Sequence, residues 1–171
     1  MNLLITGPPR CGKTTLIKRV SGEPDIALKV GGFITEEIRR KGERIGFEII
    51  TYPDGKRGLL ARKGLRSSYR LGRYGICLED LENIGCTAIE KALSSNKIVV
   101  IDEIGKMELF SQKFRDVLLE ALRSSPPVLA TVMEREHDFA DRIKRRADVQ
   151  LRLLRRENFE SLYKDVLKWI G

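Results

Sequence analysis

A glycine-rich segment near the start of the chain constrains the fold most strongly. Gly7-Pro8-Pro9-Arg10-Cys11-Gly12-Lys13-Thr14 fits the pattern G-x-x-x-x-G-K-[ST] at every fixed position. It follows an apolar run at residues 3–6, which predicts a buried strand, and it precedes a helix-forming stretch from residue 12 to about residue 20. A strand, a glycine loop and a helix in this order predict a phosphate-binding (Walker A) loop in an α/β sheet.

The spacing of the fixed positions in this pattern has a chemical reason. Gly7 and Gly12 let the backbone turn so that successive N–H groups point at one cluster of phosphate oxygens, beside the positive end of the following helix. Lys13 is predicted to reach the β- and γ-phosphates, and the Thr14 hydroxyl to ligate Mg²⁺. The predicted nucleotide-binding residues of this segment are Gly7, Pro8, Pro9, Arg10, Cys11, Gly12, Lys13, Thr14 and Thr15.

A second candidate motif is an apolar run, Ile98-Val99-Val100-Ile101, that ends in Asp102 and Glu103. In phosphate-loop proteins an acidic residue at the end of a neighbouring strand holds Mg²⁺, and Asp102 is placed for that role. Glu103 could orient and deprotonate a water molecule for attack on the γ-phosphate, and we predict it to be catalytic together with Lys13. The plainer interpretation is that both carboxylates only complement a helix N-terminus.

The remaining pattern predicts a doubly wound α/β sheet with an antiparallel meander inserted at about residues 32–62. We find no linker or repeat and therefore expect one domain over residues 1–171. Further strands are predicted at residues 76–78, 97–101, 127–132 and 149–153. Helices are predicted around residues 81–92, from Phe110 to Leu122 with Ser111 as N-cap, at 137–146, and from Phe159 to Ile170.

The charge balance points to an anionic partner. The 171 residues carry 32 Lys and Arg against 24 Asp and Glu, a net charge of +8. No apolar run approaches the roughly 18 residues of a membrane span, and the first residues already predict a strand rather than a targeting peptide. The three cysteines show no C-x-x-C spacing, so neither zinc nor a disulfide framework is favoured. We therefore expect a soluble cytoplasmic protein without a membrane partner.

Several longer segments resemble the cancer-related nucleoside-triphosphatase family of phosphate-loop proteins along nearly the whole chain. They are the Gly7–Thr14 loop, Gly32–Arg39 followed by Gly46-Phe47, Gly72-Arg73-Tyr74-Gly75 and, most distinctively, Ile101–Ser111. The resemblance implies a RecA-like mixed sheet of about nine strands with helices on both faces. It also implies Mg²⁺-dependent hydrolysis of nucleoside triphosphates with little base selectivity. By position, it places Ile98, Val99, Val100, Ile101, Asp102, Glu103, Ile104 and Gly105 at the nucleotide site.

Other residues have two interpretations each. Residues 56–73 hold seven basic side chains and no acid, and residues 141–156 hold seven basic and two acidic ones. Most of these charges are expected to be solvated, although Arg73, Arg145 or Arg146 could contact the γ-phosphate. Thr131, in an apolar strand, could sense the γ-phosphate or bond nearby backbone. Among the remaining candidates, His137 is expected at the surface or as a cap, Cys11 as a structural or redox-sensitive thiol, and Tyr163 and Trp169 in packing.

The function predicted from these features is a Mg²⁺-dependent nucleoside triphosphatase that acts on ATP, GTP, CTP and UTP or TTP. The first alternative is a small nucleotide or metabolite kinase, which would use residues 56–73 as an anion-binding lid. The second is a nucleic-acid-stimulated ATPase, which only the basic charge supports. A nucleic-acid partner is therefore not favoured, and a monomer is slightly preferred over an oligomer.

Overall fold

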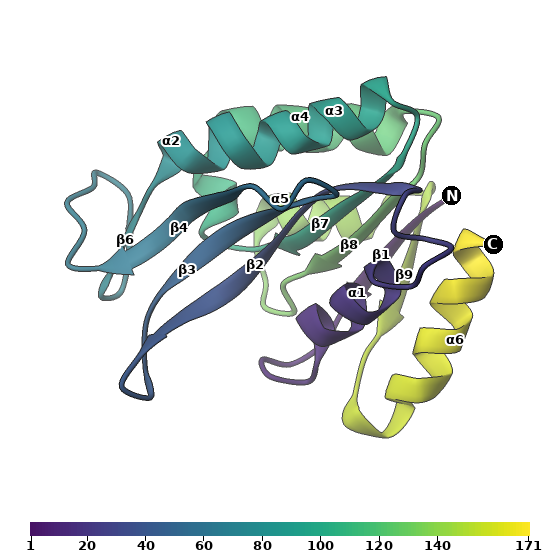
Figure 1. Ribbon diagram of the computed structural model, residues 1–171, viewed down its shortest axis with the longest axis horizontal. Coiled ribbons are helices and arrows are strands. Elements are labelled where there is room, and N and C mark those ends of the chain that lie inside the picture. The colour runs from purple at the N-terminus through teal and green to yellow at the C-terminus, as the bar shows by residue number, and fades with distance from the viewer.

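A nine-stranded mixed sheet runs through the computed structural model, which describes residues 1–171 (Figure 1). Its strand order is β5-β6-β4-β3-β2-β7-β8-β1-β9. The strands are β1 (Asn2–Thr6), β2 (Val30–Arg40), β3 (Glu43–Tyr52), β4 (Arg57–Lys63), β5 (Arg70–Leu71), β6 (Tyr74–Ile76), β7 (Ile98–Ile104), β8 (Val128–Val132) and β9 (Val149–Leu153). Strands β2, β7, β8, β1 and β9 are parallel, whereas β3, β4, β6 and β5 extend the sheet in antiparallel fashion.

Helices cover both faces of the sheet, as expected from the sequence (Figure 1). They are α1 (Lys13–Ser21), α2 (Leu78–Asp80), α3 (Thr87–Ser94), α4 (Gln112–Arg123), α5 (Asp138–Lys144) and α6 (Phe159–Ile170). A π-helical segment, Leu81–Cys86, joins α2 to α3, and short 3₁₀ turns stand at Glu108–Phe110 and Arg156–Asn158. Helices α3, α4 and α5 pack on one face, and α1 and α6 on the other. None of the helices combines the length and the apolar character that crossing a bilayer requires.

The central strands β1, β7 and β8 are mostly apolar because both of their faces are covered, and their polar residues lie at or near their ends. In β7, Val99 and Ile101 pack in the core beneath α3 and α4, whereas Val100 packs in the core beneath α1 and α6. This alternation follows from the two-residue period of a strand. The two cores hold the carboxyl ends of these strands in fixed positions, and the site described below is built at those ends.

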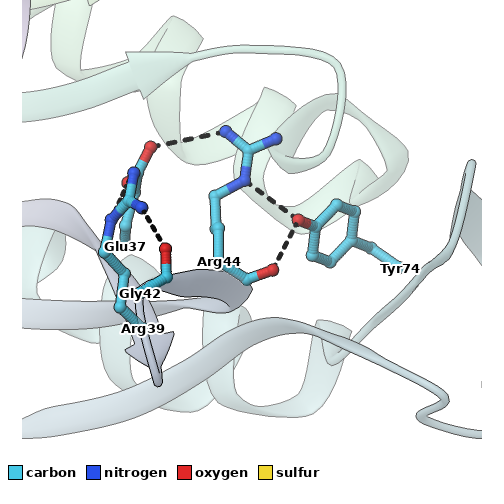
Figure 2. A network of polar contacts seen from close by, with 5 residues as sticks. All are labelled: Glu37, Arg39, Gly42, Arg44 and Tyr74. Atoms are coloured by element: carbon cyan, nitrogen blue, oxygen red, sulfur yellow. Dashed lines mark hydrogen bonds and ion pairs between the residues drawn. The ribbon is translucent and has the colours of Figure 1, made fainter.

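The inserted meander forms as predicted, and Figure 2 shows how its projecting hairpin is held. Arg39 binds the Glu37 carboxylate and donates to the Gly42 carbonyl, which closes the tip of the β2–β3 hairpin. Arg44 donates to Glu37 and, over 2.9 Å, to the hydroxyl of Tyr74 in β6. Each exposed pair of this kind contributes only about 0–1 kcal/mol. Together they connect the hairpin to the outer strand, which gives Tyr74 a structural role.

Three details differ from the sequence-based prediction. The strand expected at residues 76–78 ends at Ile76, because the helical segment already starts at Leu78. Phe110 lies in a 3₁₀ turn and not in α4, because Ser111 has extended backbone and its hydroxyl caps the helix by accepting from the Phe114 N–H. The strand β5 has only two residues, too few to show a pattern.

Candidate functional site

Three parallel strands bring the predicted site residues to one edge of the sheet. Parallel strands all end at the same edge, and here β1 leads into the glycine loop at residues 7–14. Strand β7 supplies Asp102 and Glu103 near its carboxyl end, and β8 supplies Thr131 near its own. Ligands of open α/β sheets bind at this edge. The structure therefore brings together residues that are more than a hundred positions apart in the chain.

The loop itself needs glycine at both of its fixed glycine positions. A Cβ on Gly7 would lie 2.4 Å from the carbonyl oxygen of Leu154, which excludes any side chain there. Gly12 has a φ of 105°, a left-handed conformation that favours glycine, and it caps α1. The Lys13 ammonium folds back over the loop and donates to the carbonyls of Gly7 (2.7 Å) and Pro8 (3.2 Å). Its charge is thus held at the place where the loop amides gather.

Asp102 is the centre of a buried hydrogen-bond network. The Thr14 hydroxyl donates to one carboxylate oxygen over 2.8 Å, and the Thr131 hydroxyl donates to the other over 2.5 Å. Burial raises the pKa of Asp102, and these two hydroxyls and the Lys13 charge oppose the rise. The Thr131 hydroxyl bonds Asp102 and not nearby backbone, so the backbone interpretation is wrong. Its contact with a γ-phosphate stays a prediction.

The pair of Thr14 and Asp102 suits a magnesium ion. A hydroxyl and a carboxylate are the hard oxygen donors that Mg²⁺ prefers, and here they face each other at hydrogen-bond distance. No group of three or more His, Cys, Asp and Glu side chains is arranged to hold a metal ion by itself. In proteins Mg²⁺ usually keeps several waters and takes further ligands from substrate phosphates.

A second buried carboxyl group, that of Glu108, lies beside Glu103. A Cβ placed on Gly105 would lie 2.8 Å from an oxygen of Glu103 and 2.8 Å from an oxygen of Glu108, so the two groups face each other across this glycine. Burial raises the pKa of both carboxyl groups. The Asp102 charge raises the pKa of Glu103 further, and Lys13 opposes this. The charges of Glu103 and Asp102 raise the pKa of Glu108. Sequence reasoning did not single out Glu108, because a charged residue in a short turn is usually solvated.

The other predicted nucleotide-binding residues divide into two groups. Arg10, Pro9 and Thr15 are exposed around the loop, whereas Cys11 is buried in the core beneath α1 and α6. Val99, Val100 and Ile101 have no exposed surface, and Ile98 begins β7 at the opposite edge of the sheet. The side chains of Val99, Val100, Ile101 and Ile104 pack in the core, and the strand that they form carries Asp102 and Glu103 to the site. The placement of Ile98–Gly105 at the nucleotide, which the resemblance implies, stays a prediction.

The three arginines considered as γ-phosphate contacts all lie elsewhere. Arg73 is in the turn between β5 and β6, and four strands separate β5 from β7. Arg145 and Arg146 precede β9, at the amino-terminal edge, and Arg146 binds Asp148 through two hydrogen bonds of 2.8 and 2.6 Å. The arginines that follow a parallel strand at the edge of the phosphate loop are Arg10 after β1, Arg135 after β8, and Arg155 and Arg156 after β9.

The remaining candidates have structural roles. The His137 Nδ1 accepts from the Phe139 N–H and caps α5, as one of its two interpretations predicted. Tyr163 packs in the core beneath α6, with Trp169 partly buried against it. The buried position of Cys11 favours the structural interpretation of its thiol over a redox-sensitive one.

Comparison with known proteins places this arrangement in a family. A model of the NTPase family matches residues 2–167. The nucleoside-triphosphatase THEP1 of Thermotoga sp. (strain RQ2) is 47% identical over 167 residues, which cover 98% of this chain and 94% of the relative. The THEP1 protein of Methanocaldococcus jannaschii is 39% identical over 171 residues, covering 99% and 97%.

Solved structures agree with the sequence relatives. The crystal structure of THEP1 from the hyperthermophile Aquifex aeolicus matches with a TM-score of 0.90 at 35% identity, covering 100% of this chain and 99% of that one. The solution structure of a human cancer-related nucleoside triphosphatase matches with a TM-score of 0.84 at 34% identity, covering 99% and 97%. The resemblance predicted from the sequence motifs is thereby confirmed, and the chain belongs to the THEP1 nucleoside-triphosphatase family.

Proposed function

We propose that this protein is a Mg²⁺-dependent nucleoside triphosphatase that converts nucleoside triphosphates to diphosphates and phosphate, with residues 1–171 acting as a single domain. The observation that carries the proposal is the hydrogen bond of 2.8 Å between Thr14, at the end of the loop, and Asp102 in β7. It puts the phosphate-binding amides, a metal-ligating pair and Glu103 at one edge of the sheet. Family membership supports the same class of reaction.

The residues of the loop would bind the triphosphate and stabilise the charge that develops on the leaving diphosphate. The N–H groups of residues 7–14 and the N-terminus of α1 bind phosphate oxygens, and Lys13 is held over the loop to reach the β- and γ-phosphates. Thr14 and Asp102 would hold Mg²⁺, with Thr131 fixing the Asp102 carboxylate. When bound, the ion neutralises charge on the β- and γ-phosphate oxygens.

Glu103 would orient the attacking water and accept its proton. The residue follows Asp102 directly and is partly buried, and its raised pKa makes it a stronger base than an exposed glutamate. The gain in basicity comes from burial and from the adjacent Asp102 charge. Because all of these interactions are with phosphates, which every nucleoside triphosphate shares, we propose low selectivity among the bases.

Measurement of phosphate release from ATP, GTP, CTP and UTP tests the proposal. Each nucleotide is assayed once with Mg²⁺ and once with a chelator instead of Mg²⁺. We expect release from all four nucleotides, at rates within about tenfold of one another, and none with the chelator. The Lys13→Ala variant serves as the control for contaminating phosphatases, and it should lose both binding and turnover. Tight nucleotide binding with little phosphate release would contradict the proposal and favour a kinase that lacks its acceptor.

A further inference from the structure

A separate cavity of about 220 Å³ lies at the amino-terminal edge of the parallel strands. Gly31 near the start of β2 and Lys97 just before β7 form one wall, and the turn that follows β3, residues 51–56, forms another. Helix α3 closes the third side. The phosphate loop follows the carboxyl end of β1, so the cavity is at the opposite edge of the sheet from the site described above.

Three lysines line this cavity and none of them has a carboxylate partner. Lys56, Lys91 and Lys97 make no ion pair, and their ammonium groups donate no hydrogen bond within the protein. Like charges that converge on one hollow repel each other, and an anion between them removes that repulsion.

The uncharged lining supplies further donors. Thr87 and Lys91 of α3 and Ser95, the residue that caps its carboxyl end, recur at intervals of four residues and line the cavity from the same side. The hydroxyls of Thr87 and Ser95 have no partner within the protein. Ala88 and Ala92 of α3 line the same hollow. A Cβ on Gly31 would come within 2.8 Å of the Ala92 side chain, so glycine lets β2 pack closely against α3 at this wall.

One carboxylate, Asp54, also borders the cavity, but it is held in place by the turn. The Thr51 hydroxyl donates to it, and the Lys56 N–H donates to that same hydroxyl. The hydrogen bond from Thr51 lowers the pKa of Asp54, and the Lys91 charge adds to this effect. Three cationic groups against one anionic group leave the lining positive at neutral pH.

We propose that this cavity binds a small oxyanion of the phosphate class that carries two negative charges. The volume is below the roughly 300–1,000 Å³ of pockets for larger organic ligands, which limits the occupant to a small group. Charge-assisted hydrogen bonds from Lys56, Lys91 and Lys97, with hydroxyl donors beside them, match the tetrahedral oxygens of such an anion. The proposal does not depend on the chemistry at the phosphate loop.

Titration with inorganic phosphate, followed by amide NMR shifts of the full chain, tests the site. We expect saturable shifts at residues 87–97 and 51–56, separate from any shifts at residues 7–15. Nitrate, which carries a single charge, should produce no saturable shift at the cavity. An equal response to nitrate, or no phosphate response at residues 51–56 and 87–97, would overturn the proposal.

Matched variants sharpen the test. Lys91→Gln combined with Lys97→Gln should weaken phosphate binding at the cavity by about tenfold or more, the order expected for losing hydrogen bonds to charged groups. Lys164→Gln, an exposed lysine on α6 away from the cavity, should leave it unchanged. Asp54→Asn should strengthen binding, because it removes the only carboxylate and keeps an oxygen to accept from Thr51. Unchanged affinity in the double lysine variant would refute the assignment, and weaker binding in Asp54→Asn would do the same.

Discussion

At the scale of single residues, the site concentrates three carboxyl groups beside one ammonium. Asp102 and Glu108 are buried, Glu103 is partly buried, and Lys13 is the nearest basic group that lowers the pKa values of Asp102 and Glu103. Burying acids in this way costs stability unless hydrogen bonds or a cation compensate. The Mg²⁺ of the proposed function would bring positive charge to the same edge of the sheet.

The pH dependence of stability reports on Glu108. Because its pKa is raised well above 4.5 in the folded protein, the folded state retains this proton after the unfolded chain has lost it. The contribution of this proton to the stability of the folded state is fully present below about pH 4.5. It is lost as the pH rises through the folded-state pKa of Glu108. A glutamine has no proton to lose, so the melting temperature of Glu108→Gln should rise relative to the wild type as the pH increases.

Thermal melts of both proteins without nucleotide or metal, between about pH 4 and pH 8, provide the measurement. The matched control is Glu120→Gln, at an exposed position on α4. Its difference in melting temperature from the wild type should not change with pH. If the difference in melting temperature between Glu108→Gln and the wild type were equally independent of pH, the inference that burial raises the pKa of Glu108 would be wrong.

At the scale of elements, Asn2 joins the start of β1 to its neighbours. Its amide nitrogen donates to the carbonyls of Leu122 in α4 (3.0 Å) and of Asp148 (3.2 Å), and its side-chain oxygen accepts from the Val128 N–H in β8 (2.9 Å). All of this is at the amino-terminal edge, and Asn2 is buried. The contacts fix the register of the strand that presents the phosphate loop.

Asn2→Ala would leave buried backbone groups without partners. Each such group costs about 1–3 kcal/mol, so we expect the free energy of unfolding to fall by about 2–4 kcal/mol. Denaturant unfolding followed by circular dichroism measures this change. The control is Asn83→Ala, because Asn83 is exposed and its side chain makes no hydrogen bond within the protein. We expect this substitution to change the free energy of unfolding by no more than about 0.5 kcal/mol. Similar losses in both variants would refute the role of Asn2.

The sequence predicted those elements in which local pattern and local chemistry agree. The β1–loop–α1 unit, the β2–β3 hairpin and β9 follow from apolar periodicity combined with glycine or turn residues. The position of Glu108 could not be predicted, because its burial depends on how the turn at residues 105–110 folds against β7. The sequence could not choose among the candidate arginines for a related reason: counting charges along the chain does not tell which edge of the sheet they reach.

At the scale of the whole molecule, the net charge of +8 calls for a test of nucleic-acid binding. Single-stranded nucleic acid usually needs aromatic side chains on which bases stack. Tyr69 is the only aromatic residue among the exposed large hydrophobic side chains, and its ring already packs against Phe110. We expect weak binding that disappears with added salt and no effect of oligonucleotides on turnover.

Fluorescence anisotropy with a labelled oligonucleotide at about 50 and 200 mM salt measures the binding. Rates of phosphate release with and without the oligonucleotide measure its effect on turnover. Turnover that increases with oligonucleotide would contradict this expectation and favour the nucleic-acid-stimulated ATPase.

In the proposed reaction, a water molecule activated by Glu103 accepts the γ-phosphate. A comparison of nucleotide affinity and Mg²⁺-dependent phosphate release for the wild type and Glu103→Gln tests this step. We expect the variant to retain its affinity within a few-fold and to release phosphate about 10²–10⁴ times more slowly, the usual contribution of a general base. Equal rates of release in the two proteins would refute the role of Glu103.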